Sequence, residues 1–406
     1  MLDRIKEKLK ELSPVYGDAF YILDSRKFNN NFSELSKAFK SIYPNFNIAY
    51  SYKTNYTPKL CKIVNDNDGY AEVVSEMELE LASRIGVRAN RIIWNGPIKN
   101  RDKMRQFLLL GGTINIDSVF EMDEIKEIAK ANPDHCLNVG IRCNFDVGDG
   151  VVSRFGFDIE GVEFEQTLSS IRNVKNIHLI NIQCHFAKRN LDYWAARAKK
   201  MAQLAFYVKE KLGYLPDRID IGGGLFGYMD DVLKAQFNVP IPTYEDYAKV
   251  AASVFTKYFP NAEPELLIEP GTALVGDCMQ FVGRVETIKT VRGKTFATMI
   301  GSQKNIGMGT VNPPIFVIKF GLDRKCYKDV DIVGYTCIEG DVLYHGYSGD
   351  LAVGDYVVFS NCGSYSLVMK PPFILPNFPV VDISGDCVEM IKCKENFDDV
   401  FRTFSF

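Results

Sequence analysis

Strand-like and helical segments alternate regularly along the chain between residues 47 and 269. Short apolar runs predict eight strands, at Asn47–Tyr52, Tyr70–Val74, Arg91–Trp94, Thr113–Ile116, Leu137–Cys143, Leu179–His185, Arg218–Ile221 and Leu266–Glu269. Helical patterns lie between successive strands, the longest of them at Leu191–Leu212. Eight strands that alternate with helices are typical of a (β/α)8 barrel. We therefore predict an α/β fold built on a TIM-like barrel.

The pattern changes after Gly271, where apolar and polar residues alternate in short segments separated by Gly, Asp and Asn. These segments predict a mostly antiparallel β domain. A further short strand at Phe20–Leu23 precedes the barrel and is expected to join that sheet. The predicted barrel domain is 28–272, and residues 1–27 and 273–406 are expected to form a β-barrel or sandwich domain.

Bulk properties exclude several classes of function. The net charge is −3 and no basic run is present, which argues against a nucleic-acid partner. No apolar stretch approaches the roughly 20 residues that span a bilayer. Residues 1–11 predict a short amphipathic helix without the apolar core of a signal peptide. Ten cysteines without a CxxC pair fit a reducing cytoplasm, and Cys136, Cys143 and Cys184 are expected to be buried thiols.

In a (β/α)8 barrel the chemistry lies at the C-terminal ends of the strands, and several predicted strands end on polar or glycine residues. Lys53 ends the first strand. An isolated lysine at such a place is usually a solvated side chain. In a barrel mouth, however, desolvation can lower the pKa of the amine, which can then form a Schiff base with an aldehyde cofactor.

Three other strand ends allow a structural and a functional reading. Gly222, Gly223 and Gly224 form either a tight turn or a phosphate cradle, but not a GxGxxG fingerprint. Glu269 is either a salt-bridged structural carboxylate or the partner of a protonated ring nitrogen. His185 is either structural or stacks on a flat cofactor. The four histidines have no metal-ligand spacing, so no metal site is predicted.

Nine motifs occur in one order along nearly the whole chain: Tyr-Ser-Tyr-Lys-Thr-Asn (50–55), Glu-Val-Val-Ser-Glu-Met-Glu-Leu (72–79), Ile-Arg-Cys-Asn (141–144), Ser-Arg-Phe-Gly-Phe (153–157), Cys-His-Phe (184–186), Asp-Ile-Gly-Gly-Gly (220–224), Ile-Glu-Pro-Gly (268–271), Gly-Tyr-Thr-Cys-Ile-Glu-Gly-Asp (334–341), and Gly-Asp-Tyr-Val-Val-Phe followed by Gly-Ser-Tyr (354–365). Together they resemble the ornithine/diaminopimelate decarboxylase family. These are fold type III enzymes with an alanine-racemase-like barrel that use pyridoxal 5′-phosphate (PLP).

The resemblance implies a role for each matching residue. Lys53 would form the Schiff base with PLP, and Glu269 would keep the ring nitrogen protonated so that the ring acts as an electron sink. His185 would stack on the ring, and Cys337 would return a proton after CO2 leaves the quinonoid intermediate. The remaining cofactor contacts would be Glu72, Arg142, Gly222, Gly223, Gly224, Gly271 and Tyr365. Family members are homodimers with active sites at the interface, so Cys337 would act from the partner subunit.

The chain departs from the family at positions that read the substrate. Ile338 stands where an acidic residue follows the cysteine, with Glu339 one position further on. Thr272 replaces the arginine that usually follows Glu-Pro-Gly, and Lys188 is expected to supply positive charge near the phosphate. We take Ile338, Glu339, Asp341 and Thr272 as candidate substrate contacts.

These departures predict a PLP-dependent decarboxylase of a non-standard amino acid or amino-acid conjugate in a specialised biosynthetic pathway. One alternative is diaminopimelate, ornithine or lysine decarboxylation in primary metabolism. A second is an amino-acid racemase, and a third is a catalytically dead regulatory homologue. A PLP-free sugar-phosphate barrel would leave the motifs at Cys337 and Tyr365 unexplained.

Overall fold

A computed structural model describes residue 8, residues 11–307 and residues 311–406 of the chain. It divides into two compact units. The barrel unit comprises Asn29–Gly227 and Pro242–Ala273. The β unit comprises the described residues up to Phe28, together with Tyr228–Ile241 and Leu274–Phe406.

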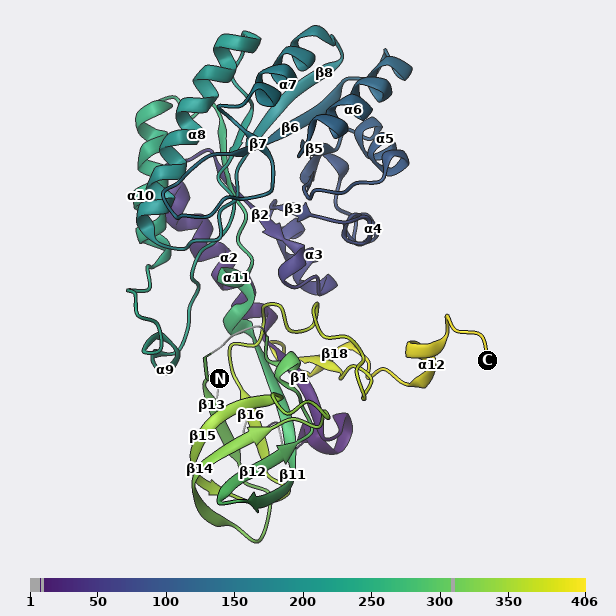
Figure 1. The fold of residues 1–406 in the computed structure, drawn as a ribbon, viewed down its shortest axis with the longest axis vertical. Coiled ribbons are helices and arrows are strands. Elements are labelled where there is room, and N and C mark those ends of the chain that lie inside the picture. Colours follow the sequence, from purple (N-terminus) through teal and green to yellow (C-terminus); the bar gives the residue numbers. More distant parts are fainter. Residues whose placement is uncertain (1–7, 9–10, 308–310) are drawn as a thin grey trace. The chain divides into compact units, whose positions relative to one another are not determined.

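The barrel unit contains a closed barrel of eight parallel strands (Figure 1). The strands are β2 (Phe46–Ser51), β3 (Tyr70–Val73), β4 (Ile92–Trp94), β5 (Thr113–Ile116), β6 (Leu137–Asn144), β8 (Ile177–Gln183), β9 (Arg218–Asp220) and β10 (Glu265–Ile268). They pair in the order β5-β4-β3-β2-β10-β9-β8-β6, and the pairing of β5 with β6 closes the barrel. A short strand, β7 (Phe157–Asp158), extends β6. The predicted α/β barrel is confirmed, with each strand within two residues of its predicted bounds.

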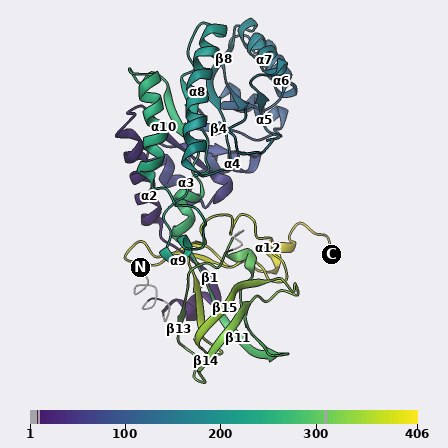
Figure 2. The same cartoon turned by 60° about the vertical axis from the view of Figure 1, so that its left-hand side comes forward.

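Helices surround the barrel on the outside (Figure 1). They are α2 (Ser25–Lys40), α3 (Pro58–Asp66), α4 (Glu76–Arg84), α5 (Arg101–Leu109), α6 (Val119–Ala131), α7 (Val162–Asn173), α8 (Leu191–Leu212) and α10 (Tyr244–Tyr258). Several helices begin at a residue whose side chain accepts a hydrogen bond from the first turn, such as Ser75 before α4 and Thr243 before α10. Gly213 ends α8 in the left-handed conformation, with φ of 89°. Helices α8 and α10 lie side by side in both ribbon views (Figure 2).

The strands of the barrel are buried at nearly every position, as expected for a parallel sheet covered by helices. Several buried polar residues of these strands lie inside the barrel. Asn115, Asn181 and Gln183 are each at most 1% exposed. Buried amides of this kind are costly unless they are hydrogen-bonded.

The β unit contains a nine-stranded sheet. Its strands are β1 (Ala19–Leu23), β11 (Met279–Val291), β12 (Lys294–Met299), β13 (Ile315–Ile318), β14 (Lys325–Val333), β15 (Val342–Leu351), β16 (Tyr356–Phe359), β17 (Val380–Asp382) and β18 (Glu389–Lys392). Six of the eight strand pairings are antiparallel, which confirms the predicted mostly antiparallel domain. The predicted strand at Phe20–Leu23 does join this sheet, because β1 pairs with β11 and β17.

Several sequence expectations differ in detail from the structure. Residues 228–241, which the predicted range 28–272 includes, group with the β unit, where Gln236 exchanges hydrogen bonds with Asn312.

Cys143 and Cys184 are buried, but Cys136 is exposed because it lies in the turn before β6. The helix predicted for residues 1–11 falls almost entirely outside the described residues. Within the described part of the chain, no helix has both the length and the apolar character needed to cross a membrane.

Candidate active site

Lys53 lies directly after β2, in a single turn of 3-10 helix (η1, Tyr52–Thr54). Its Nζ forms an ion pair with the Glu72 carboxylate on β3 and lies 3.4 Å from Ser51 Oγ. The Lys53 side chain is 31% exposed, whereas that of Glu72 is fully buried. The amine is therefore the accessible end of an ion pair whose acidic end lies inside the barrel.

Glu269 follows β10 and is 2% exposed. Its Oε1 accepts a hydrogen bond from Asn95 Nδ2 at 2.6 Å, and Gln183 Nε2 lies 3.1 Å from both carboxylate oxygens. Burial by itself raises the pKa of such a carboxyl group. The hydrogen bond with His185 and the charges of Lys53, His185 and Arg142 outweigh burial and lower the pKa of Glu269 to about 2. Glu269 is thus an ionised acceptor inside the barrel.

The His185 ring lies beside Glu269, after the end of β8. Its Nδ1 is 3.3 Å from Glu269 Oε2 and 3.2 Å from the backbone nitrogen of Gly223. These contacts require opposite roles of Nδ1, because the carboxylate needs a donor and the N–H needs an acceptor. A hydrogen bond to an ionised carboxylate is the stronger one, so we assign the proton to Nδ1. The side chain is 28% exposed, which leaves part of the ring accessible.

The turn after β9 requires glycine for steric reasons. Gly222 and Gly224 have positive φ, of 72° and 80°. A Cβ on Gly222 would lie 2.2 Å from the carbonyl oxygen of Cys184, and one on Gly223 would lie 2.3 Å from that of Glu269. Close packing of this turn against neighbouring backbone is therefore enough to explain the glycines. The Gly222 N–H donates to Asp220 Oδ1 at 2.8 Å, so that amide already has a partner.

Three further predicted residues lie near these strand ends. A Cβ on Gly271 would lie 2.0 Å from Thr54 Oγ1, so glycine there lets the end of β10 approach the Lys53 turn closely. Thr272 is the first residue of α11 (Thr272–Val275). Lys188 is exposed, and its backbone carbonyl lies 3.3 Å from the Cβ position of Gly224.

Arg142, on β6, belongs to the same electrostatic cluster. Its side chain is 12% exposed and its Nη1 lies 3.9 Å from Asp117 Oδ1. The guanidinium stacks over the ring of Phe155, 4.6 Å from the centroid. Its charge contributes to the lowered pKa of Glu269.

The other predicted site residues belong to the β unit. Cys337, Ile338 and Glu339 are exposed in the connection between β14 and β15. Asp341, in contrast, is buried. Its Oδ1 accepts from Ser302 Oγ and from the backbone of Gln303, and its Oδ2 accepts from Thr336 Oγ1 at 2.6 Å. Its carboxylate is thus occupied in holding the connection that carries Cys337.

A hollow of about 390 Å³ lies beside this connection in the β unit. Ile338, Phe373, Lys304 and Lys370 are among the residues that line it. Burial lowers the pKa of Lys370 to about 8. Tyr365, also in the β unit, has a φ of 57°, which is unusual for a residue other than glycine.

The sequence places Asn95 and Asp220 among the polar residues at predicted strand ends without a role, and sequence reasoning missed the amides within the strands: Asn115, Asn181 and Gln183. The signal was an amide within an apolar strand, as in Ile-Asn115-Ile and Ile-Asn181-Ile-Gln183. Asp220 is also fully buried, and burial together with the charge of Glu269 raises its pKa well above the ordinary value. The shift favours the protonated form of Asp220 beside the ionised Glu269.

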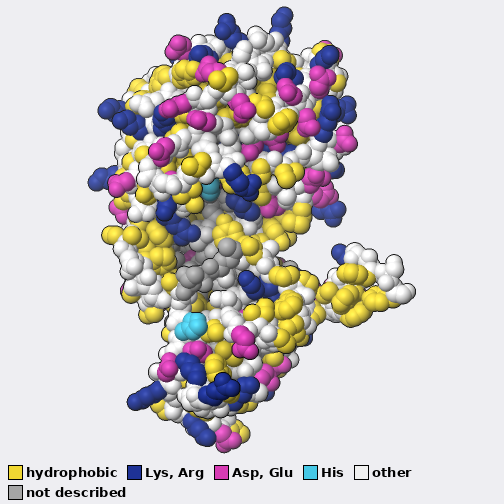
Figure 3. Space-filling view, viewed as in Figure 1, with side chains coloured by type: hydrophobic (Ala, Val, Ile, Leu, Met, Phe, Trp, Pro, Cys, Tyr) yellow, Lys and Arg dark blue, Asp and Glu magenta, His cyan; other side chains and the backbone are white. Residues whose placement is uncertain are grey.

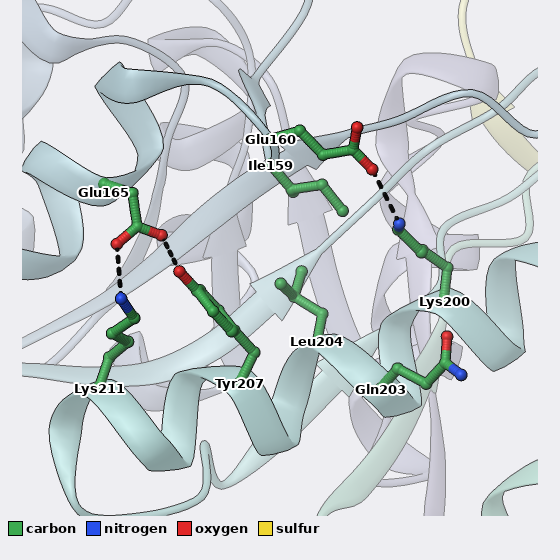
Figure 4. Close-up of a pocket in the computed structure, with 8 residues that line it drawn as sticks. All are labelled: Ile159, Glu160, Glu165, Lys200, Gln203, Leu204, Tyr207 and Lys211. Carbon is green, nitrogen blue, oxygen red and sulfur yellow. Dashed lines mark hydrogen bonds and ion pairs between the residues drawn. The ribbon is translucent and has the colours of Figure 1, made fainter.

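A second hollow, of about 480 Å³, lies on the outside of the barrel between α7 and α8 (Figure 4). Lys200 pairs with Glu160 and Lys211 with Glu165 there, and Tyr207 also donates to Glu165. Its charged groups pair with one another, away from the strand ends. Charges of both signs are interspersed over the barrel helices on the face shown in Figure 3.

Comparisons with known proteins identify the family. The family described as pyridoxal-dependent decarboxylase, pyridoxal binding domain, matches residues 27–276. A diaminopimelate decarboxylase of Aquifex aeolicus is 26% identical over 412 residues, covering 96% of this chain and 92% of that protein. One from Archaeoglobus fulgidus is 25% identical, covering 97% and 94%.

The fold is also that of solved relatives. The crystal structure of diaminopimelate decarboxylase from Methanocaldococcus jannaschii has a TM-score of 0.87 at 22% identity, covering 98% of this chain and 94% of that one. The family match spans more than half of the chain. The chain therefore belongs to the pyridoxal-dependent decarboxylase family, and it is an amino-acid decarboxylase that uses pyridoxal 5′-phosphate.

Proposed function

We propose that this chain decarboxylates diaminopimelate, with Lys53 and Glu269 as the central cofactor-binding groups. One observation carries the proposal: relatives matched over almost the whole chain are named diaminopimelate decarboxylases. The comparisons do not support the predicted specialised substrate and favour the alternative in primary metabolism. Ile338 and Thr272 therefore carry less weight against diaminopimelate than the sequence alone suggested.

The residues at the strand ends fit PLP. Lys53 offers a partly exposed amine for an aldehyde, and Glu269 offers an ionised acceptor for a protonated ring nitrogen. The glycine turn at 222–224 follows β9 and is proposed to hold the phosphate through backbone N–H groups. These are the three features that the cofactor requires of a protein.

When bound, PLP supplies the electron sink for the electrons that remain after CO2 leaves. The protein supplies the placement and the charges. Glu72 orients Lys53 Nζ, and Glu269 would supply the negative charge that keeps a ring nitrogen protonated. His185 donates from Nδ1 to Glu269 and covers one side of the site, while Arg142 adds positive charge nearby.

Diaminopimelate carries a second carboxylate, which requires a cation in the protein. The hollow beside Cys337 has two lysines, Lys304 and Lys370, and its one carboxylate, Asp341, already accepts several hydrogen bonds. This combination suits the far end of diaminopimelate, which carries a carboxylate as well as an ammonium, better than the lone distal ammonium of ornithine. It is a charge argument in favour of diaminopimelate over ornithine.

The test is CO2 release by the PLP-loaded protein with meso-diaminopimelate, the two ornithine enantiomers, lysine and arginine. We expect release from diaminopimelate, with lysine as the product. Release from ornithine or arginine in its place would overturn the proposed substrate. Chiral analysis of the same samples reports racemisation, the alternative reaction.

We further propose that the protein works as a homodimer in which Cys337 of one protomer serves the site of its partner. Variants Lys53→Ala and Cys337→Ala should each be inactive alone. Mixing them under subunit exchange should restore up to about a quarter of wild-type activity, because half of the dimers then carry one intact site of two. Native mass spectrometry checks that mixed dimers form. Mixed dimers without recovered activity would contradict a shared site.

A further inference from the structure

Two carboxylates of the site, Glu72 and Glu269, are bridged by one side chain. Asn95 Nδ2 donates to Glu72 Oε1 at 2.9 Å and to Glu269 Oε1 at 2.6 Å. Asn95 follows β4 and is 3% exposed. Both hydrogens of its amide group are therefore committed to the carboxylate that orients Lys53 and to the carboxylate proposed for the ring nitrogen.

The orientation of the Asn95 amide group is set by two further amides inside the barrel. Asn115 Nδ2 donates to Asn95 Oδ1 at 2.7 Å, and Asn181 Nδ2 donates to Asn115 Oδ1 at 2.9 Å. An ionised carboxylate only accepts, so Asn95 must turn its NH2 group toward Glu72 and Glu269. Each amide further back must then donate forward as well. Asn181 Oδ1, at the rear of the chain, has no hydrogen-bond partner among the described residues.

The barrel makes room for this chain of amides. A Cβ on Gly140, in β6, would lie 1.8 Å from Asn115 Oδ1, so any larger residue there would displace the amide. Asn115 and Asn181 are 1% and 0% exposed, so the bonds they make are shielded from bulk water. In such surroundings aligned hydrogen bonds polarise one another, which strengthens the last donor in the chain.

Other charged and titratable groups also face the two carboxylates, from the neighbouring strand ends. These are Lys53 after β2, Arg142 on β6, His185 after β8 and Asp220 on β9. Lys53, the first of these, pairs with Glu72 on the side of the site where the cofactor would bind. Asn95 differs from all of them because it is neutral and binds both carboxylates at once.

We propose that Asn95 is a positioning residue, which holds Glu72 and Glu269 at a fixed separation so that Lys53 and the cofactor ring nitrogen each meet a preset partner. The inference rests on the proposed roles of Lys53 and Glu269. Asn115 and Asn181 act through Asn95 by orienting its amide group. Their effects should therefore diminish with distance along the chain.

The test is PLP binding to the apoprotein, measured by calorimetry, in Asn95→Leu, Asn115→Leu and Asn181→Leu. We expect the dissociation constant to rise on the order of 10- to 100-fold for Asn95→Leu, the range for hydrogen bonds to charged groups. It should rise less for Asn115→Leu and least for Asn181→Leu. All three amides are buried, so a purely structural role would not predict this order.

Asn176→Leu is the matched control. Its amide also makes three hydrogen bonds, to the carbonyl oxygens of Ala129, Asn132 and His135, but it lies before β8, at the other end of the barrel. It should lower the melting temperature without changing PLP binding more than about two-fold. Equal PLP binding by wild type and Asn95→Leu would overturn the inference. Failure of the wild type to bind PLP at all would instead overturn the proposed function.

Discussion

Replacing Lys53 by arginine is expected to lower decarboxylation by at least on the order of 10³-fold, the scale seen when a covalent catalytic group is lost. Arginine keeps a cation beside Glu72, but its guanidinium stays protonated and is no nucleophile for an aldehyde. Borohydride reduction of the PLP-loaded protein followed by peptide mass spectrometry provides the measurement. The wild type should carry the cofactor mass on the peptide that contains Lys53, and Lys53→Arg should not.

Lys99 provides a matched control for this variant. It also follows a barrel strand, β4, and pairs with a carboxylate, Glu121, at 2.9 Å, but its side chain is fully buried. Lys99→Arg should lower thermal stability and leave the borohydride adduct on Lys53. An adduct that persists in Lys53→Arg, or that disappears only in Lys99→Arg, would show that the wrong lysine has been assigned.

The contrast between these two lysines shows what the sequence could and could not predict. Both stand after apolar strand-like runs, so local pattern alone treats them alike. The difference lies in tertiary structure. The Lys99 side chain is fully buried beside Glu121, whereas the Lys53 side chain is 31% exposed. Motif resemblance, rather than spacing, singled out Lys53.

The barrel itself was predictable because its signal is local. Buried parallel strands are short apolar runs, and the helices between them begin at capping residues such as Ser75 and Thr243. Strand β15 (Val342–Leu351) was not predicted, because its two glycines and its polar residues weaken the local β pattern. Its pairing with β14 is a tertiary effect that a local pattern does not contain.

The interior of the site was less predictable. Lys53, Glu72, His185 and Glu269 end or follow strands, and closure of the barrel brings those ends together. Asn95 also follows a strand, but a single asparagine before a glycine reads as a turn. Its role depends on Asn115 and Asn181, which only the strand order β4-β5-β6-β8 places behind it.

Glu269→Gln is expected to reduce decarboxylation by about 10²- to 10³-fold at neutral pH, the range for loss of one preorganised electrostatic contact. Glutamine has the same shape and can still accept from Asn95 and Gln183 through one oxygen. It loses the negative charge that would keep the ring nitrogen protonated. Glu265→Gln is the control, because Glu265 lies at the start of the same strand, where it accepts from the Tyr70 hydroxyl at 2.8 Å.

The pH dependence makes this prediction sharper. The pKa of Glu269 is lowered to about 2, below the value of roughly 4.3 for an unperturbed glutamate. Its stabilising contribution is therefore present above pH 4.3 and is lost as the pH falls toward 2. Glu269 stays ionised throughout the working range, so the ratio of wild-type to Glu269→Gln activity should be constant from about pH 5.5 to pH 8. A ratio that shrinks toward pH 5.5 would mean that Glu269 takes up a proton there and does not hold the charge assigned to it.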